Sequence, residues 1–71
     1  MMTECERIRN MLNVSRAEFS RRYNIPVRTL EAWEKGDRQP PQYVLDLLER
    51  VVREDAKKEL SEILSKIVNE D

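Results

Sequence analysis

The residues of this sequence that are best suited to chemistry are cationic, and they lie in its first half. Residues 7–38 hold eight arginine and lysine side chains against four aspartate and glutamate side chains, although the whole chain has a net charge of −1. The guanidinium of Arg28 can donate two parallel hydrogen bonds to guanine, and Val27 and Ala32 can pack on a thymine methyl group. Glu31 can accept a hydrogen bond from cytosine. This segment is therefore expected to attract a polyanion and to contact its bases.

Other cations of the same segment are suited to phosphate groups rather than to bases. Arg16, Lys35 and Arg38 would raise the affinity for nucleic acid without preferring one base sequence. Arg22 has two interpretations, because it could contact phosphate or pair with Glu18 four residues earlier on one helix.

Two of the candidate contacts also have a purely structural interpretation. Arg28 could pair with Glu31 or Glu34 on the surface of one helix. Trp33 could stack on a base, but its three-residue spacing from Leu30 favours a place in the core.

The residue types that most catalytic and metal sites need are missing. The chain has no histidine and a single cysteine, Cys5, whose spacing from Ile8 and Leu12 is that of a small buried side chain. Glu54 and Asp55 lie in a charged helical stretch with no nearby nucleophile. We therefore expect no enzyme activity, no metal site and no cofactor. No apolar run approaches the roughly 18 residues of a membrane span, and the first residues do not resemble a signal peptide, so a cytoplasmic protein is expected.

Short helices are predicted to position the cationic segment. Thr3 and Glu6 have the pattern of a capping box, which predicts a helix over about residues 4–12. Ser15 and Glu18 repeat the pattern and begin a second helix.

A bend is predicted between this second helix and a third. Asn24 tolerates the left-handed conformation of a helix end, and Pro26 disfavours helix at Ile25 before it. Pro26 is then compatible with the first turn of the third helix, which has Gly36 as its left-handed cap.

Two apolar stripes follow the loop that contains the paired prolines. The first stripe comprises Val44, Leu47, Leu48, Val51 and Val52, and the second comprises Leu60, Ile63, Leu64, Ile67 and Val68. Residues 53–58 between the stripes contain no glycine or proline. They are either a bend or the solvated middle of one long helix, and propensity does not decide between the two.

The run "SRAEFSRRYNIPVRTLEAWEKGDRQP" resembles the helix-turn-helix of the lambda-repressor-like family, the Cro-type or XRE regulators. Cap, turn, tryptophan, Glu-x-Gly and proline occur together in register, and the resemblance covers residues 8 to about 52. It implies an all-α fold, a compact four- or five-helix bundle. It also implies binding to operator DNA, generally as a symmetric dimer.

The same resemblance implies two sets of DNA contacts. Base contacts fall on Val27, Arg28 and Ala32, with Thr29 able to reach either a base or a phosphate. Backbone contacts fall on Lys35 and Arg38.

Three positions depart from the family pattern. Arg16 stands where the family commonly has glutamine, and arginine suits a phosphate at least as well. Asn24 stands where the turn normally has glycine. Pro26 replaces a serine or threonine, so the hydroxyl that would cap the third helix is absent.

The second apolar stripe needs a partner. We divide the chain into a helix-turn-helix domain over residues 1–53 and a helical extension over residues 54–71, and we expect Leu60, Ile63, Leu64 and Ile67 to form a dimer interface. The alternative is a fifth helix that closes the core of the monomer.

These observations favour a transcriptional regulator that binds double-stranded DNA. The expected protein is a repressor that binds a palindromic operator as a homodimer. The alternative is a protein-interaction module, such as the antitoxin of a toxin–antitoxin pair, with a toxin as its partner.

Overall fold

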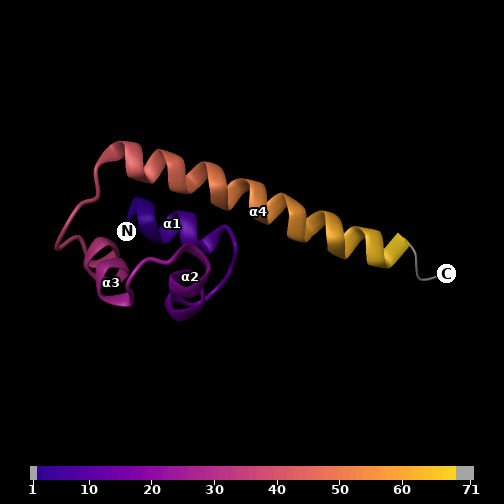
Figure 1. Cartoon of the computed structure of the whole chain (residues 1–71), viewed down its shortest axis with the longest axis horizontal. Coiled ribbons are helices and arrows are strands. Elements are labelled where there is room, and N and C mark those ends of the chain that lie inside the picture. The colour runs from indigo at the N-terminus through magenta and orange to yellow at the C-terminus, as the bar shows by residue number, and fades with distance from the viewer. Residues whose placement is uncertain (1, 69–71) are drawn as a thin grey trace.

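Three short helices pack beneath the first half of a fourth, long helix (Figure 1). The computed structural model describes residues 2–68, and the helices within that range are α1 (Glu4–Asn10), α2 (Arg16–Tyr23), α3 (Val27–Lys35) and α4 (Gln42–Val68). No strand occurs among these residues, so the all-α prediction is confirmed. Residues 69–71 of the predicted extension lie outside the described range.

The two predicted N-terminal caps are both present. The Glu6 amide donates to Thr3 Oγ1 at 3.3 Å, and the Glu18 amide donates to Ser15 Oγ at 3.1 Å. α1 ends at Asn10, two residues earlier than predicted. Residues 11–13 continue as a tighter turn, in which the Asn13 amide donates to the Asn10 carbonyl at 3.2 Å, and the positive φ of 55° at Asn13 then ends the helical path.

The bend between α2 and α3 forms where it was predicted. Asn24 caps α2 in the left-handed conformation with φ 54°, and the Ile25 amide donates to the Ser20 carbonyl at 3.2 Å. Pro26 is the N-cap of α3, and no side chain caps that end. Gly36 ends α3 with φ 85°.

α4 is one continuous helix, which decides between the two interpretations of residues 53–58. These residues form its middle, as their lack of glycine and proline allows. α4 also continues without a break through residue 53, where we placed the end of the helix-turn-helix domain.

The core lies between α1, α2, α3 and the first half of α4. Its fully buried side chains are Phe19, Ile8, Leu30 and Val52. Trp33 is half-buried and packs against this core, as predicted, and Ala56 is the last residue of α4 to do so. We call α1, α2, α3 and α4 as far as Ala56 the bundle.

The remainder of α4, residues 57–68, extends past the bundle and is called the overhang (Figure 1). Here the second apolar stripe does not close the monomer core. Its side chains are between 53% and 64% exposed, and they are Leu60, Ile63, Leu64 and Ile67. The side chain of Val68 lies outside the described part of the structure.

Candidate nucleic-acid interface

The outer side of α3 carries three of the predicted contacts. Leu30 and Glu34 are buried and define the inner side of this helix. At 3.6 residues per turn, Arg28, Ala32 and Lys35 lie on the opposite side. Arg28 and Lys35 are exposed and Ala32 is half-buried, so α3 presents two cations and a methyl group outward.

Arg28 is available to a ligand in this arrangement. Within residues 2–68 its guanidinium forms no ion pair, and the predicted alternative of a pair with Glu31 or Glu34 is not observed. Glu34 is occupied on the inner side of the helix by other cations.

The first five residues of α3 hold the other predicted base contacts. Val27 is 38% exposed, while Thr29 and Glu31 are half-buried on either flank. Because no side chain caps this end, the amides of the first turn keep their hydrogen-bonding capacity for solvent or a ligand.

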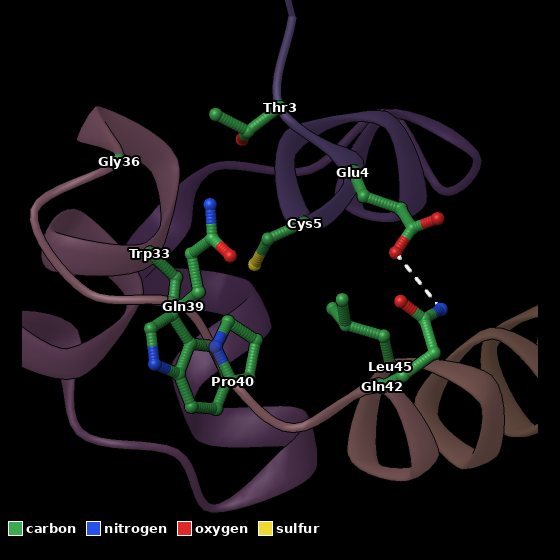
Figure 2. A pocket seen from close by; sticks show the side chains of 9 residues that line it. All are labelled: Thr3, Glu4, Cys5, Trp33, Gly36, Gln39, Pro40, Gln42 and Leu45. Atoms are coloured by element: carbon green, nitrogen blue, oxygen red, sulfur yellow. Dashed lines mark hydrogen bonds between the residues drawn. The ribbon is translucent and has the colours of Figure 1, made fainter.

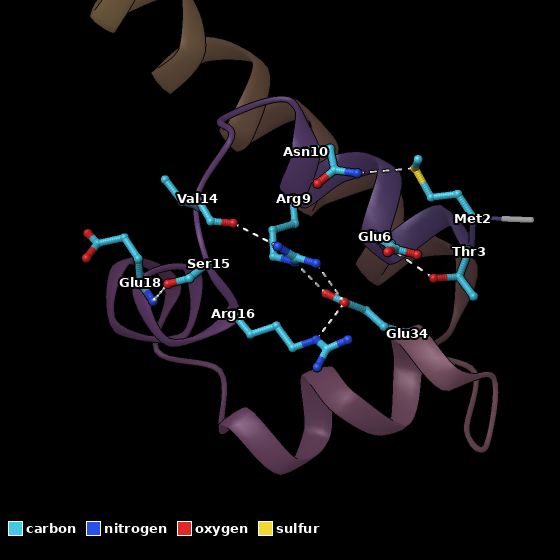
Figure 3. Close-up of polar contacts among 10 residues, drawn as sticks. All are labelled: Met2, Thr3, Glu6, Arg9, Asn10, Val14, Ser15, Arg16, Glu18 and Glu34. Carbon is cyan, nitrogen blue, oxygen red and sulfur yellow. Dashed lines mark hydrogen bonds and ion pairs between the residues drawn. The ribbon is translucent and has the colours of Figure 1, made fainter.

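Arg16, at the start of α2, is held in place by a hydrogen bond to the buried Glu34 of α3. Its Nε donates to Oε1 of Glu34 at 2.8 Å, and its side chain remains 43% exposed (Figure 3). Among the described residues, this is the one hydrogen bond that the Arg16 guanidinium forms. It uses Nε and neither of the two Nη atoms. The contact therefore fixes the side chain while leaving donors available at the protein surface.

Glu34 and Arg9 form a buried ion pair that sequence reasoning missed. Arg9 donates through Nε and Nη2 to the two carboxylate oxygens at 2.8 and 3.0 Å, and through Nη1 to the Val14 carbonyl at 2.8 Å (Figure 3). The Glu34 side chain is 1% exposed. This network ties α1, the loop before α2, and α3 together.

The pKa of Glu34 reflects two opposing effects. Burial raises the pKa of this carboxyl, but the hydrogen bonds from Arg9 and Arg16 outweigh burial, and the net pKa lies below the ordinary value. The carboxylate is thus ionised at neutral pH. A signal was present in the sequence, since Glu34 lies four residues after the buried Leu30 and therefore on the apolar side of α3.

Arg22 pairs with carboxylates on two helices. It donates to Glu18 at 3.1 Å, which is one of its two predicted interpretations, and to Glu59 on α4 at 2.6 Å. Lys35 and Arg38 lie on either side of Gly36 and are exposed.

A cavity of about 270 Å³ lies away from the outer side of α3, where the start of α1 meets the loop before α4 (Figure 2). Cys5 lines it but is only 2% exposed, and burial raises the pKa of its thiol to about 11. The predicted role of Cys5 as a small buried side chain is confirmed.

Residues 2–68 contain neither a metal-binding cluster nor a membrane span. No cluster of three or more histidine, cysteine, aspartate or glutamate side chains in this range could hold a metal ion. No helix in it combines the length and apolarity of a membrane span.

Comparison with known proteins places this geometry in context. The helix-turn-helix family model matches residues 6–56, which include α2, the bend, α3 and the first half of α4. No curated protein and no solved structure gives a match.

Proposed function

Since the chain belongs to the lambda-repressor-like family of helix-turn-helix DNA-binding regulators, we propose that it represses transcription by binding a palindromic operator as a homodimer. The outer side of α3 is the observation that carries this proposal. It offers Arg28 without a competing carboxylate, beside a small apolar side chain, at the end of α3 that no side chain caps. A recognition helix that enters the major groove needs this arrangement.

Five residues of α3 have a proposed role in reading bases. Arg28 donates two hydrogen bonds to a guanine, and Ala32 and Val27 pack against thymine methyl groups. Glu31 accepts a hydrogen bond from cytosine, and Thr29 contacts a base or the adjacent phosphate.

Four cations are proposed to bind the phosphate backbone: Lys35, Arg38, Arg16 and Arg22. Arg16 is already oriented by Glu34, so binding needs little rearrangement of its side chain. Arg22 must exchange at least one of its two carboxylate partners for a phosphate.

The overhang is proposed to hold the two protomers together. Its apolar side chains recur at intervals of three and four residues, a spacing that suits pairing between helices, and they are Leu60, Ile63, Leu64 and Ile67. Their exposure in the single chain supports a contact with a second copy.

The same exposed stripe supports the second candidate function, a protein-interaction module such as an antitoxin that binds a toxin. The two candidates differ in what they require. Operator binding requires Arg28 and Arg38 in addition to the dimer contact, whereas binding of a protein partner requires Ile63 and Ile67 but not these two arginines.

Selection from random duplex DNA tests the proposed function. The purified chain is incubated with the pool at moderate salt, where phosphate contacts alone do not retain DNA. We expect an enriched palindrome whose half-site spacing gives the dimer geometry. A folded protein that enriches no sequence would contradict operator recognition and favour the interaction module.

Two variants then separate base reading from phosphate binding. Arg28→Ala should relax the preference at one position of each half-site, at a cost of about 1–3 kcal/mol in discrimination. Lys35→Ala should weaken binding to all DNA sequences alike. It should also lower the slope of log affinity against log salt concentration by about one unit. An unchanged preference in Arg28→Ala would remove this residue from the base-reading set.

A further inference from the structure

A second exposed apolar surface lies on the first half of α4. Tyr43, Leu47 and Val51 are 67%, 56% and 48% exposed, although this part of the helix belongs to the bundle. We call these three residues the Leu47 face.

The Leu47 face continues into an apolar hollow of about 330 Å³ beside the bend between α2 and α3. Ile25 and Trp33 line the hollow from the helix-turn-helix, and Val44 lines it from α4. The face is therefore one side of a broad apolar surface rather than an isolated set of exposed side chains.

This surface and the stripe of the overhang lie on opposite sides of α4. Val51 and Leu60 are separated by about two and a half turns, and Leu47 and Ile67 by about five and a half turns, at 3.6 residues per turn. Because α4 is one continuous helix, a straight helix of a second chain cannot cover both surfaces. The Leu47 face therefore needs a contact of its own.

The shape of the Leu47 face fits another helix. A notch on α4 is lined by Tyr43, Asp46, Leu47 and Arg50, which follow the i, i+3, i+4, i+7 spacing. Four residues at this spacing form the hole that receives one side chain of a facing helix in knobs-into-holes packing.

The charges of the notch point to a second copy of this chain. If two α4 helices pair antiparallel around Leu47, Tyr43 of one copy meets Val51 of the other, and the two Leu47 side chains meet each other. Asp46 of each copy then lies beside Arg50 of the other. One chain thus supplies both members of two symmetric, oppositely charged pairs, as an isologous contact requires.

We propose that the Leu47 face is a second self-association surface, through which dimers held by the overhang join into larger assemblies. The proposal rests on the homodimer of the proposed function.

Sedimentation of the full chain over a wide range of concentration tests the proposal. The unmodified chain should exceed the mass of a dimer at high micromolar concentration. Leu47→Asp should stop at the dimer, with the dissociation constant of the second step raised by about 100-fold, because the substitution occurs twice in a symmetric contact. Ser61→Asp adds the same charge to an exposed position of α4 and should behave like the unmodified chain.

A substitution in the overhang separates this proposal from the dimer itself. Ile63→Asp should also stop at the dimer, and the two substitutions together should give a monomer. If Leu47→Asp and Ser61→Asp associate equally, the Leu47 face is not a self-contact. If Ile63→Asp changes nothing while Leu47→Asp is monomeric, the overhang dimer fails and the Leu47 face alone joins the copies. Monomers from each single substitution would indicate one composite interface and overturn the proposal.

Exchange of the two charges tests the identity of the occupant. Asp46→Arg alone and Arg50→Asp alone each place like charges across the contact, so each should weaken association through this face. An equimolar mixture of the two variants restores opposite charges and should associate again. A mixture that stays as weak as its components would exclude the antiparallel contact between copies.

Discussion

The bundle and the overhang share the helix α4, yet among the described residues the buried apolar side chains of that helix occur only in the bundle. Leu45 and Val52 are 8% and 0% exposed, whereas Ile63 and Leu64 are 56% and 53% exposed. Val52 belongs to the first apolar stripe, and Ile63 and Leu64 belong to the second, whereas Leu45 is a neighbour of the first stripe that the prediction did not include.

The difference shows what apolar periodicity does and does not specify. A stripe defines one side of a helix, but burial requires other elements opposite that side. α1, α2 and α3 provide apolar partners only as far as Ala56, and beyond it α2 contacts α4 through the exposed Arg22–Glu59 pair. Matched substitutions in the two regions test this contrast.

The largest contrast is expected for isoleucine. Ile8→Ala removes a fully buried side chain from the bundle and should lower the free energy of unfolding by about 4 kcal/mol. Ile63→Ala in the overhang should change it by less than about 0.5 kcal/mol at a concentration where the chain is monomeric. Urea titrations of both variants measure the difference. Equal losses would show that the overhang packs against the bundle in solution.

Glutamate should give the next largest contrast. Glu34→Gln leaves Arg9 with a neutral partner in a buried site and should lower the free energy of unfolding by about 3 kcal/mol. Glu62→Gln changes an exposed residue of the overhang and should have almost no effect. Thermal unfolding of both variants at pH 7 compares them, and similar midpoints would argue against the buried pair.

The pH dependence of that loss sharpens the comparison. The pKa of Glu34 is lower in the folded chain than its ordinary value of about 4.3, so its ion pair stabilises the fold above that value. This stabilisation is lost as the pH falls through the lowered pKa. The gap in stability between the unmodified chain and Glu34→Gln should therefore narrow below about pH 4. A gap for Glu34→Gln that is constant with pH would mean that the charge of Glu34 is not responsible.

The smallest contrast concerns the backbone. Gly36→Ala should lower the free energy of unfolding by about 1 kcal/mol, because a residue with a Cβ is strained at the φ of 85° found there. No steric clash adds to this cost, since an added Cβ would meet no atom within 4 Å. In the overhang, Ser61→Ala should instead stabilise the helix by at most about 0.5 kcal/mol through helix propensity. Chemical denaturation of the two variants should give shifts of opposite sign.

Much of the fold was predictable because its signals are local. Thr3 and Ser15 cap their helices through neighbouring amides, and Asn24 and Gly36 adopt conformations that few other residues tolerate. The outer side of α3 was predictable for the same reason, since helical spacing alone places Arg28 opposite Leu30.

The parts that sequence reasoning missed depend on contacts between distant segments. Glu34 was considered only as a partner of Arg28 on its own helix, whereas its partners come from α1 and α2. The Arg22–Glu59 pair joins residues 37 positions apart, and nothing near either residue indicates it. The sequence did not decide whether α4 continues through residues 53–58. These residues favour helix, but they do not indicate which other segments pack against that helix.

The burial of Cys5 supplies a built-in kinetic probe. A thiol-directed reagent attacks the thiolate, which is scarce at neutral pH when the pKa is about 11, and a side chain that is 2% exposed is out of its reach. Modification must therefore wait until α1 separates from the rest of the bundle. The labelling rate of the unaltered chain thus measures how often the bundle opens, and a bound ligand that stabilises the bundle would slow that reaction without touching the cysteine.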